Sequence, residues 1–193
     1  MWKIKKISVF QNFRKEYFIF AIGGCILSLA HPPVAIPYIV VFVLASIGWY
    51  WYRNKPSSQE SFFCGWFFGF GYFLLSLLWI IEPFLDRPNE TGILAPFALI
   101  FLTASMSIFW GLAFWSTTLR NNYRNKFVSL LKLAACLSLA ELFRSYLFTG
   151  FPWVIFGVAF VETPLGQSLA LFGPYWSTAM IIICLLYTSP SPR

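Results

Sequence analysis

The sequence predicts an all-α membrane protein, a polytopic bundle of five to six transmembrane helices whose N-terminus is cytoplasmic. The chain has 193 residues, of which 59% are hydrophobic and only 11% are charged. A soluble domain carries about 25% charged residues, so this chain has too few charges to cover a surface that faces water. None of its apolar runs alternates with the period of two that a β-barrel needs. Helices are the remaining way to satisfy the backbone inside lipid.

Six apolar runs are each close to the ~20 residues that a spanning helix needs. They cover residues 13–30, 34–52, 61–81, 94–118, 128–148 and 165–187. The first run is the shortest, and Arg14 and Lys15 at its start can extend their side chains to the membrane surface. In the third run, Gly65 and Gly69 form a small-xxx-small pair, which predicts close packing against another helix.

The distribution of basic residues predicts the orientation in the membrane. Lysines and arginines occupy the N-terminal segment and the connections near residues 53–55 and 120–126, which share one side if the helices alternate. The other side carries mainly acidic residues, namely Glu82, Asp86, Glu90 and Glu162. Because cytoplasmic segments hold the excess of lysine and arginine, the N-terminus is expected in the cytoplasm. The net charge of +7 thus reflects membrane orientation, and no nucleic-acid partner is expected.

The cysteines and the single histidine do not indicate a metal site. His31 precedes two prolines at an expected helix end, where we interpret it as an interfacial polar residue. The cysteines lack CxxC spacing and are interpreted as small buried hydrophobes. No metal or other cofactor is expected. The cysteines are Cys25, Cys64, Cys136 and Cys184.

The most informative segment covers residues 141–153 and reads Glu-Leu-Phe-Arg-Ser-Tyr-Leu-Phe-Thr-Gly-Phe-Pro-Trp. Charges inside an apolar helix are costly and usually functional. Glu141 and Arg144 can pair across one helical turn and lock the bundle, or Arg144 can hold a lipid phosphate. After the helix, a Gly, a Pro and two aromatic residues predict a stiff corner at the membrane surface, either structural or in contact with substrate. The candidate substrate-binding residues are Glu141, Arg144, Thr149, Gly150, Phe151, Pro152 and Trp153.

This segment closely resembles a motif of the apolipoprotein N-acyltransferases. Three further stretches resemble the same family in the same order. Residues 23–33 resemble the family's first helix and its exit, residues 65–72 its glycine- and aromatic-rich third helix, and residues 164–173 the stretch after the motif. The Gly-aromatic helices are weak signals alone, whereas the motif at 141–153 is specific.

The resemblance implies a multi-pass enzyme of the bacterial inner membrane. Such an enzyme transfers a fatty acyl chain from a phospholipid to the N-terminal diacylglyceryl-cysteine of lipoproteins, so a phospholipid donor and an apolipoprotein acceptor are the implied partners. In the family, a nitrilase-like domain after the helices supplies a Glu base, a Lys and a Cys nucleophile. No residue of this chain can be given those roles. We therefore assign no catalytic residue and expect this chain alone to be inactive.

The last ten residues predict a boundary between native sequence and sequence that does not belong to the protein. Residues 184–193 can be encoded by DNA that looks like a transposase-based sequencing adapter, so we expect read-through there. The alternative is a genuine polar tail. Residues 1–183 are then the native transmembrane domain of a longer protein.

Two other functions remain open from the residues. The first is a small non-enzymatic polytopic protein that binds or transports lipids, although transporters more often place charges at mid-membrane and contain repeats. The second is a related membrane domain joined to another enzyme, such as a polyprenyl-linked sugar transferase.

Overall fold

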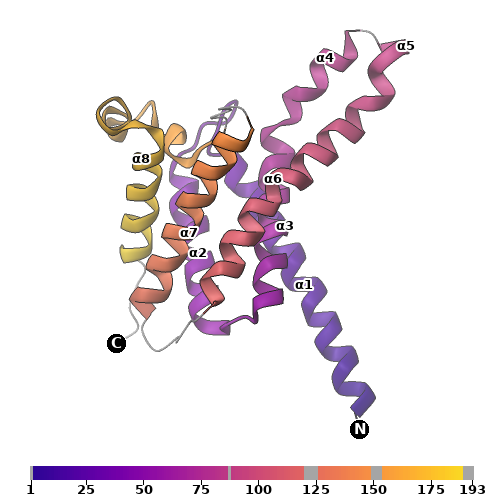
Figure 1. Cartoon of the computed structure of the whole chain (residues 1–193), viewed down its shortest axis with the longest axis vertical. Coiled ribbons are helices and arrows are strands. Elements are labelled where there is room, and N and C mark those ends of the chain that lie inside the picture. The colour runs from indigo at the N-terminus through magenta and orange to yellow at the C-terminus, as the bar shows by residue number, and fades with distance from the viewer. Residues whose placement is uncertain (1, 87, 120–125, 149–153, 189–193) are drawn as a thin grey trace.

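The computed structural model describes residues 2–86, 88–119, 126–148 and 154–188. Every regular element in these ranges is a helix, which confirms the all-α class (Figure 1). The long helices are α1 (Trp2–Ser28), α2 (Tyr38–Asn54), α3 (Ser58–Ser76), α6 (Ala95–Thr118), α7 (Lys126–Leu147) and α8 (Gln167–Thr188). The short ones are η1 (Leu78–Ile81), α4 (Glu82–Leu85), α5 (Pro88–Thr91), η2 (Gly92–Leu94), η3 (Phe156–Phe160) and η4 (Pro164–Gly166).

The long helices alternate in direction along the bundle. The N-terminus and the connection from α2 to α3 lie at one end, whereas α4 and α5 form a projection at the opposite end (Figure 1). Helix α3 packs against both α1 and α6, and α7 packs against α6 and α8. The basic N-terminal and 53–55 segments therefore share an end, and the acidic residues of α4 and α5 lie at the other.

Two of the described helices are long and apolar enough to cross a membrane. They are Pro88–Thr118, which combines α5, η2 and α6, and Pro164–Cys184. A third span results if α3 is counted together with η1 and α4, from which it is bent by 59°. The other predicted runs form helices as well, but α2 is apolar over only Tyr38–Tyr50, so the described helices meet these criteria for two or three spans.

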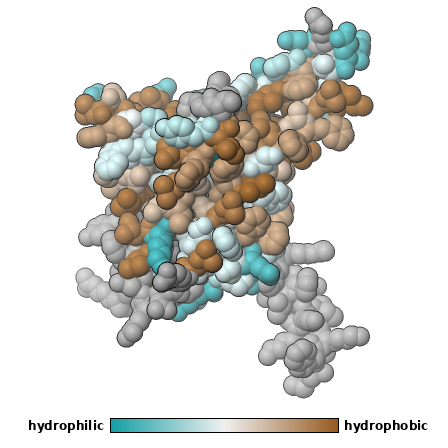
Figure 2. All heavy atoms as spheres, in the orientation of Figure 1, coloured by the Kyte–Doolittle hydropathy of each residue, from teal (hydrophilic) through white to brown (hydrophobic). Residues whose placement is uncertain are grey.

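The outer surface of the bundle is rich in large apolar side chains. Figure 2 shows them along the projection, which has a hydrophilic tip. Several aromatic rings are more than 60% exposed, as expected for a surface that contacts lipid rather than water. Those rings belong to Phe18, Tyr38, Phe42, Phe97, Phe101, Phe143, Tyr146 and Phe172.

The core is aromatic and centres on α3 and α6. Helix α3 begins with a capping box, in which Ser57 Oγ accepts from the Glu60 amide and the Glu60 carboxylate accepts from the Ser57 amide. A methyl group on Gly65 would lie 2.6 Å from the Trp110 carbonyl oxygen. Gly65 thus allows α3 and α6 to approach closely, which confirms the packing prediction. Phe68, Tyr72, Phe73, Trp110, Phe114 and Phe156 form the buried aromatic centre.

The structure corrects the sequence prediction in the last apolar run. The apolar run 165–187 is broken at Gly173, which has a φ of 78° and is followed by Pro174. Proline cannot continue the preceding helical hydrogen bonds, so α8 contains a kink. The connection before α6 contains the short helix α5, with a proline in the first helical position that this residue favours.

Candidate functional site

Glu141 and Arg144, near the end of α7, form a buried ion pair. Arg144 Nη2 donates to Glu141 Oε2 at 2.9 Å across one helical turn. Both side chains are essentially inaccessible, with exposed fractions of 0% for Glu141 and 1% for Arg144. The structure therefore contains the pairing across one helical turn that the spacing of these residues allows.

Two aromatic side chains complete the surroundings of this pair. The indole Nε1 of Trp110, on α6, donates to Glu141 Oε1 at 2.7 Å. The guanidinium carbon of Arg144 lies 5.0 Å from the centre of the Phe73 ring on α3, a distance typical of a cation–π contact. Because a buried charge is tolerated only when it is paired and hydrogen-bonded, the three helices α3, α6 and α7 are fixed relative to one another here.

A second hydrogen-bonded group continues from Trp110 toward the chain after α7. The Tyr72 ring stacks on Trp110 with centroids 4.9 Å apart. Tyr72 Oη donates to the Val154 carbonyl oxygen at 3.0 Å and lies 2.7 Å from His31 Nε2. The hydroxyl has a single proton, so His31 donates through Nε2 and its ring carries the proton on that nitrogen.

The protonation of His31 agrees with this arrangement. Burial, and to a smaller extent the positive charge of Arg144, lower the pKa of His31 to about 4. The ring is therefore neutral at pH 7. His31 follows the end of α1, as expected, but only 6% of it is exposed, because it packs against Tyr72.

The segment after the predicted corner is held from two sides. Val154 has a φ of 59°, a strained value for a β-branched residue, and its carbonyl is the acceptor of Tyr72. The Gly157 amide donates to Thr178 Oγ1 of α8 at 2.9 Å. Residues Thr149, Gly150, Phe151, Pro152 and Trp153 lie outside the described residues, so the structure brings together only Glu141 and Arg144 of the predicted set.

An apolar groove on the outer face of α6 and α7 extends toward the end of the bundle at which α7 stops. Its volume is about 370 Å³. Leu147, the last residue of α7, lies at one end of the groove, and Ser116 lies on α6 near its opposite end. The other lining residues are Phe109, Leu112, Ala113, Cys136, Leu139, Ala140 and Phe143.

Sequence reasoning missed Trp110 and Phe73, which contact the ion pair, and the neighbouring Tyr72 and His31. His31, Tyr72, Phe73 and Trp110 come from three different helices or connections and carry no shared motif. A polar residue such as His31 inside an apolar stretch signals a need for a partner, but does not say which one. Among the described residues, no group of three or more His, Cys, Asp or Glu side chains is placed to hold a metal ion.

Comparison with known proteins identifies the family. Residues 23–186 match the family model described as the apolipoprotein N-acyltransferase N-terminal domain. Three similar proteins are named apolipoprotein N-acyltransferase. The one from Rhodopseudomonas palustris is 34% identical over 72% of this chain and 25% of its own length. The one from Allorhizobium ampelinum is 29% identical over 92% of this chain and 35% of its own length. The one from Rhizobium etli is 30% identical over 90% of this chain and 34% of its own length.

The lengths of these relatives define what the match covers. This chain spans about a quarter to a third of each of the three. The family model covers most of the chain, including the ion pair, Tyr72 and His31. The chain therefore belongs to the apolipoprotein N-acyltransferase family and matches its N-terminal domain.

Proposed function

We propose that this chain is the membrane domain of an enzyme that transfers a fatty acyl chain from a phospholipid to the N-terminal diacylglyceryl-cysteine of lipoproteins. The observation that carries the proposal is the family match over residues 23–186. The phospholipid donor and the apolipoprotein acceptor are the partners of the whole enzyme, and the helices receive their lipid portions. The catalytic Glu, Lys and Cys that the resemblance implies belong to a further domain of the longer protein.

We further propose a multi-pass topology in the bacterial inner membrane, with five or six spans and the N-terminus in the cytoplasm. The alternating helices and the position of the basic segments at one end support this orientation. The short apolar helix Tyr38–Tyr50 can cross if its flanking residues reach the interface. The end that carries α4, α5 and the corner then faces the periplasm.

Within this domain, the predicted corner at 149–153 is proposed to contact the lipid substrates. Glu141 and Arg144 precede it in the chain and act as positioning residues, because their side chains are buried against Trp110 and Phe73. Tyr72 holds Val154, the residue that directly follows the corner in the chain, through its carbonyl. The groove on α6 and α7 ends at Leu147, two residues before the corner in the chain, and is apolar enough to take an acyl chain of a substrate.

The proposal that the catalytic residues belong to a further domain predicts how the chain behaves on its own. The purified 193-residue chain is expected to transfer no palmitate from phosphatidylethanolamine to a diacylglyceryl-cysteine peptide, because it supplies no nucleophile in a polar setting. The measurement is mass spectrometry of the peptide, with a full-length relative as the positive control. Palmitoylated peptide formed by the chain alone would contradict the proposal.

The proposed support of the corner predicts an effect of Tyr72. In a full-length enzyme that contains this membrane domain, Tyr72→Phe should lower kcat several-fold, because the Val154 carbonyl and His31 both lose their partner. Tyr17→Phe is the matched control, since it removes the same hydroxyl from the opposite end of the bundle. Equal activities of the two variants would show that the Tyr72 hydroxyl does not position the corner.

The boundary at residue 183 is also a proposal. We propose that residues 1–183 are native and residues 184–193 are adapter read-through. Genomic DNA sequenced outward from the codon for Glu141 should then depart from this sequence near Cys184 and continue into a domain with spaced Glu, Lys and Cys. A genomic stop codon directly after Arg193 would contradict this division and favour the non-enzymatic lipid-binding protein.

A further inference from the structure

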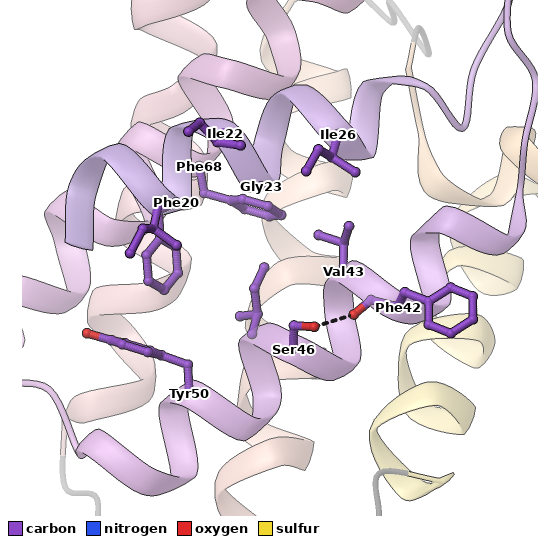
Figure 3. A pocket seen from close by; sticks show the side chains of 11 residues that line it. Phe20, Ile22, Gly23, Ile26, Phe42, Val43, Ser46, Tyr50 and Phe68 are labelled. Atoms are coloured by element: carbon purple, nitrogen blue, oxygen red, sulfur yellow. Dashed lines mark hydrogen bonds between the residues drawn. The ribbon is translucent and has the colours of Figure 1, made fainter. Parts of the chain in front are cut away.

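A second apolar groove lies between α1 and α2, away from the candidate site. Its volume is about 310 Å³, at the lower end of the usual range for small-molecule sites. Residues of α1 and α2 form its two walls, and Phe68 of α3 forms its floor (Figure 3). From Ile19 to Ile26 the wall on α1 rises roughly 10 Å, about a third of the hydrocarbon thickness of a bilayer.

The lining of this groove suits a hydrocarbon chain. Ser46 Oγ donates to the Phe42 carbonyl oxygen at 2.7 Å, so this hydroxyl is satisfied within its own helix (Figure 3). A methyl group on Gly23 would meet only the Phe68 ring, at 3.8 Å, so the glycine leaves space at the wall. The hydroxyl of Tyr50 stands at one end, where the ring packs edge-on against Phe20 with centroids 5.0 Å apart.

Both walls end in a basic residue at this same end. Lys15 precedes Ile19 by four residues on α1, and Arg53 follows Tyr50 by three residues on α2, so each continues the helix face that lines the groove. Because α1 and α2 run in opposite directions (Figure 1), the two positions lie at one end of the groove, and both side chains are exposed.

The charges at this end are predominantly positive. Glu16 lies beside the Tyr50 hydroxyl, and Glu60 is bonded to the Ser57 amide at the start of α3. Three basic residues outnumber these two carboxylates, namely Lys15, Arg53 and Lys55.

We propose that this groove binds one acyl chain of an anionic phospholipid, whose phosphate lies between Lys15 and Arg53. The apolar walls recognise the chain, and the two cations select the charge of the headgroup. The site lies at the end of the bundle opposite to Glu141 and Arg144, so the bound lipid differs from an acyl donor at the corner. The proposal rests on the groove and its charges, and it is independent of acyl transfer.

The test uses native mass spectrometry of the purified chain in detergent with dioleoylphosphatidylglycerol or dioleoylphosphatidylethanolamine. Wild type should bind the anionic lipid more tightly. Lys15→Gln combined with Arg53→Gln should weaken its binding about 30-fold, since each cation near a lipid surface contributes about 1 kcal/mol, and should leave binding of the zwitterionic lipid unchanged. Lys132→Gln on α7 removes one charge elsewhere and is the control.

The groove itself is tested by filling it. Ser46→Phe should reduce binding of both lipids, and Gly23→Leu should do the same from the opposite wall. Ser105→Phe is the matched control, because Ser105 makes the same bond to the residue four positions earlier, on α6. Wild-type lipid binding by folded Ser46→Phe and Gly23→Leu, or an undiminished preference in the double glutamine variant, would overturn the proposal.

Discussion

Replacing Arg144 with alanine is expected to destabilise the protein by about 3–5 kcal/mol, the usual cost of removing one partner of a buried ion pair. The substitution leaves the Glu141 carboxylate inaccessible to water, with only the Trp110 indole among the described hydrogen bonds still donating to it. It also removes the cation that lies over Phe73. Thermal unfolding in detergent should show a large fall in the melting temperature.

Two further variants separate charge from packing. Leu142→Ala, two residues away on the same helix, removes a partly exposed side chain and should have a much smaller effect on stability and on acyl transfer by a full-length enzyme. The double variant Glu141→Leu, Arg144→Met leaves no unpaired charge and should be more stable than Arg144→Ala. A double variant as unstable as Arg144→Ala would show that the pair acts by packing alone.

Alanine at Gly24 or Gly71 should separate α1 from α3. A methyl group on Gly24 would lie 2.0 Å from the Phe68 carbonyl oxygen, and one on Gly71 would lie 2.1 Å from the Ala21 carbonyl oxygen. Both obstacles are backbone atoms, which cannot turn aside as a side chain can. We expect each substitution to cost about 1–3 kcal/mol, as overpacking of a close contact does, with a lowered melting temperature.

Gly23→Ala provides the matched control for these two substitutions. It makes the same chemical change one residue before Gly24, but its methyl group would meet only the Phe68 ring at 3.8 Å. Because alanine is favoured over glycine inside a helix by roughly 0.5–1 kcal/mol, this variant should be neutral or slightly more stable. Equal destabilisation at positions 23, 24 and 71 would contradict the close approach of α1 and α3.

The sequence predicted the helices well because apolar runs of spanning length leave few alternatives. It predicted less well where they bend. The Gly173-Pro174 pair lies inside a run that is apolar on average, and averaging over the run hides the break. The bend of 59° after Ser76 has no proline at the bend itself and depends on how α3 and η1 pack.

The candidate site was predictable only in part. The spacing of Glu141 and Arg144 is a local property, so their pairing across a turn could be anticipated. Trp110 lies 31 residues and Tyr72 about 70 residues before these charges, and one sequence contains no signal that joins them. For the same reason, Gly65 was identified as a packing position from its local pattern, whereas the Gly24 and Gly71 contact between α1 and α3 was not.

The most direct test of the central claim is acyl transfer by a chimaeric enzyme. Residues 1–183 of this chain replace the corresponding helices of the Rhizobium etli relative, and the purified protein is assayed with phospholipid and a diacylglyceryl-cysteine peptide. We expect triacylated peptide from the chimaera, and much less from its Arg144→Ala variant. A chimaera that unfolds cooperatively at the temperature of the parent enzyme, yet forms no triacylated peptide, would contradict the assignment of these helices as the membrane domain of an acyltransferase.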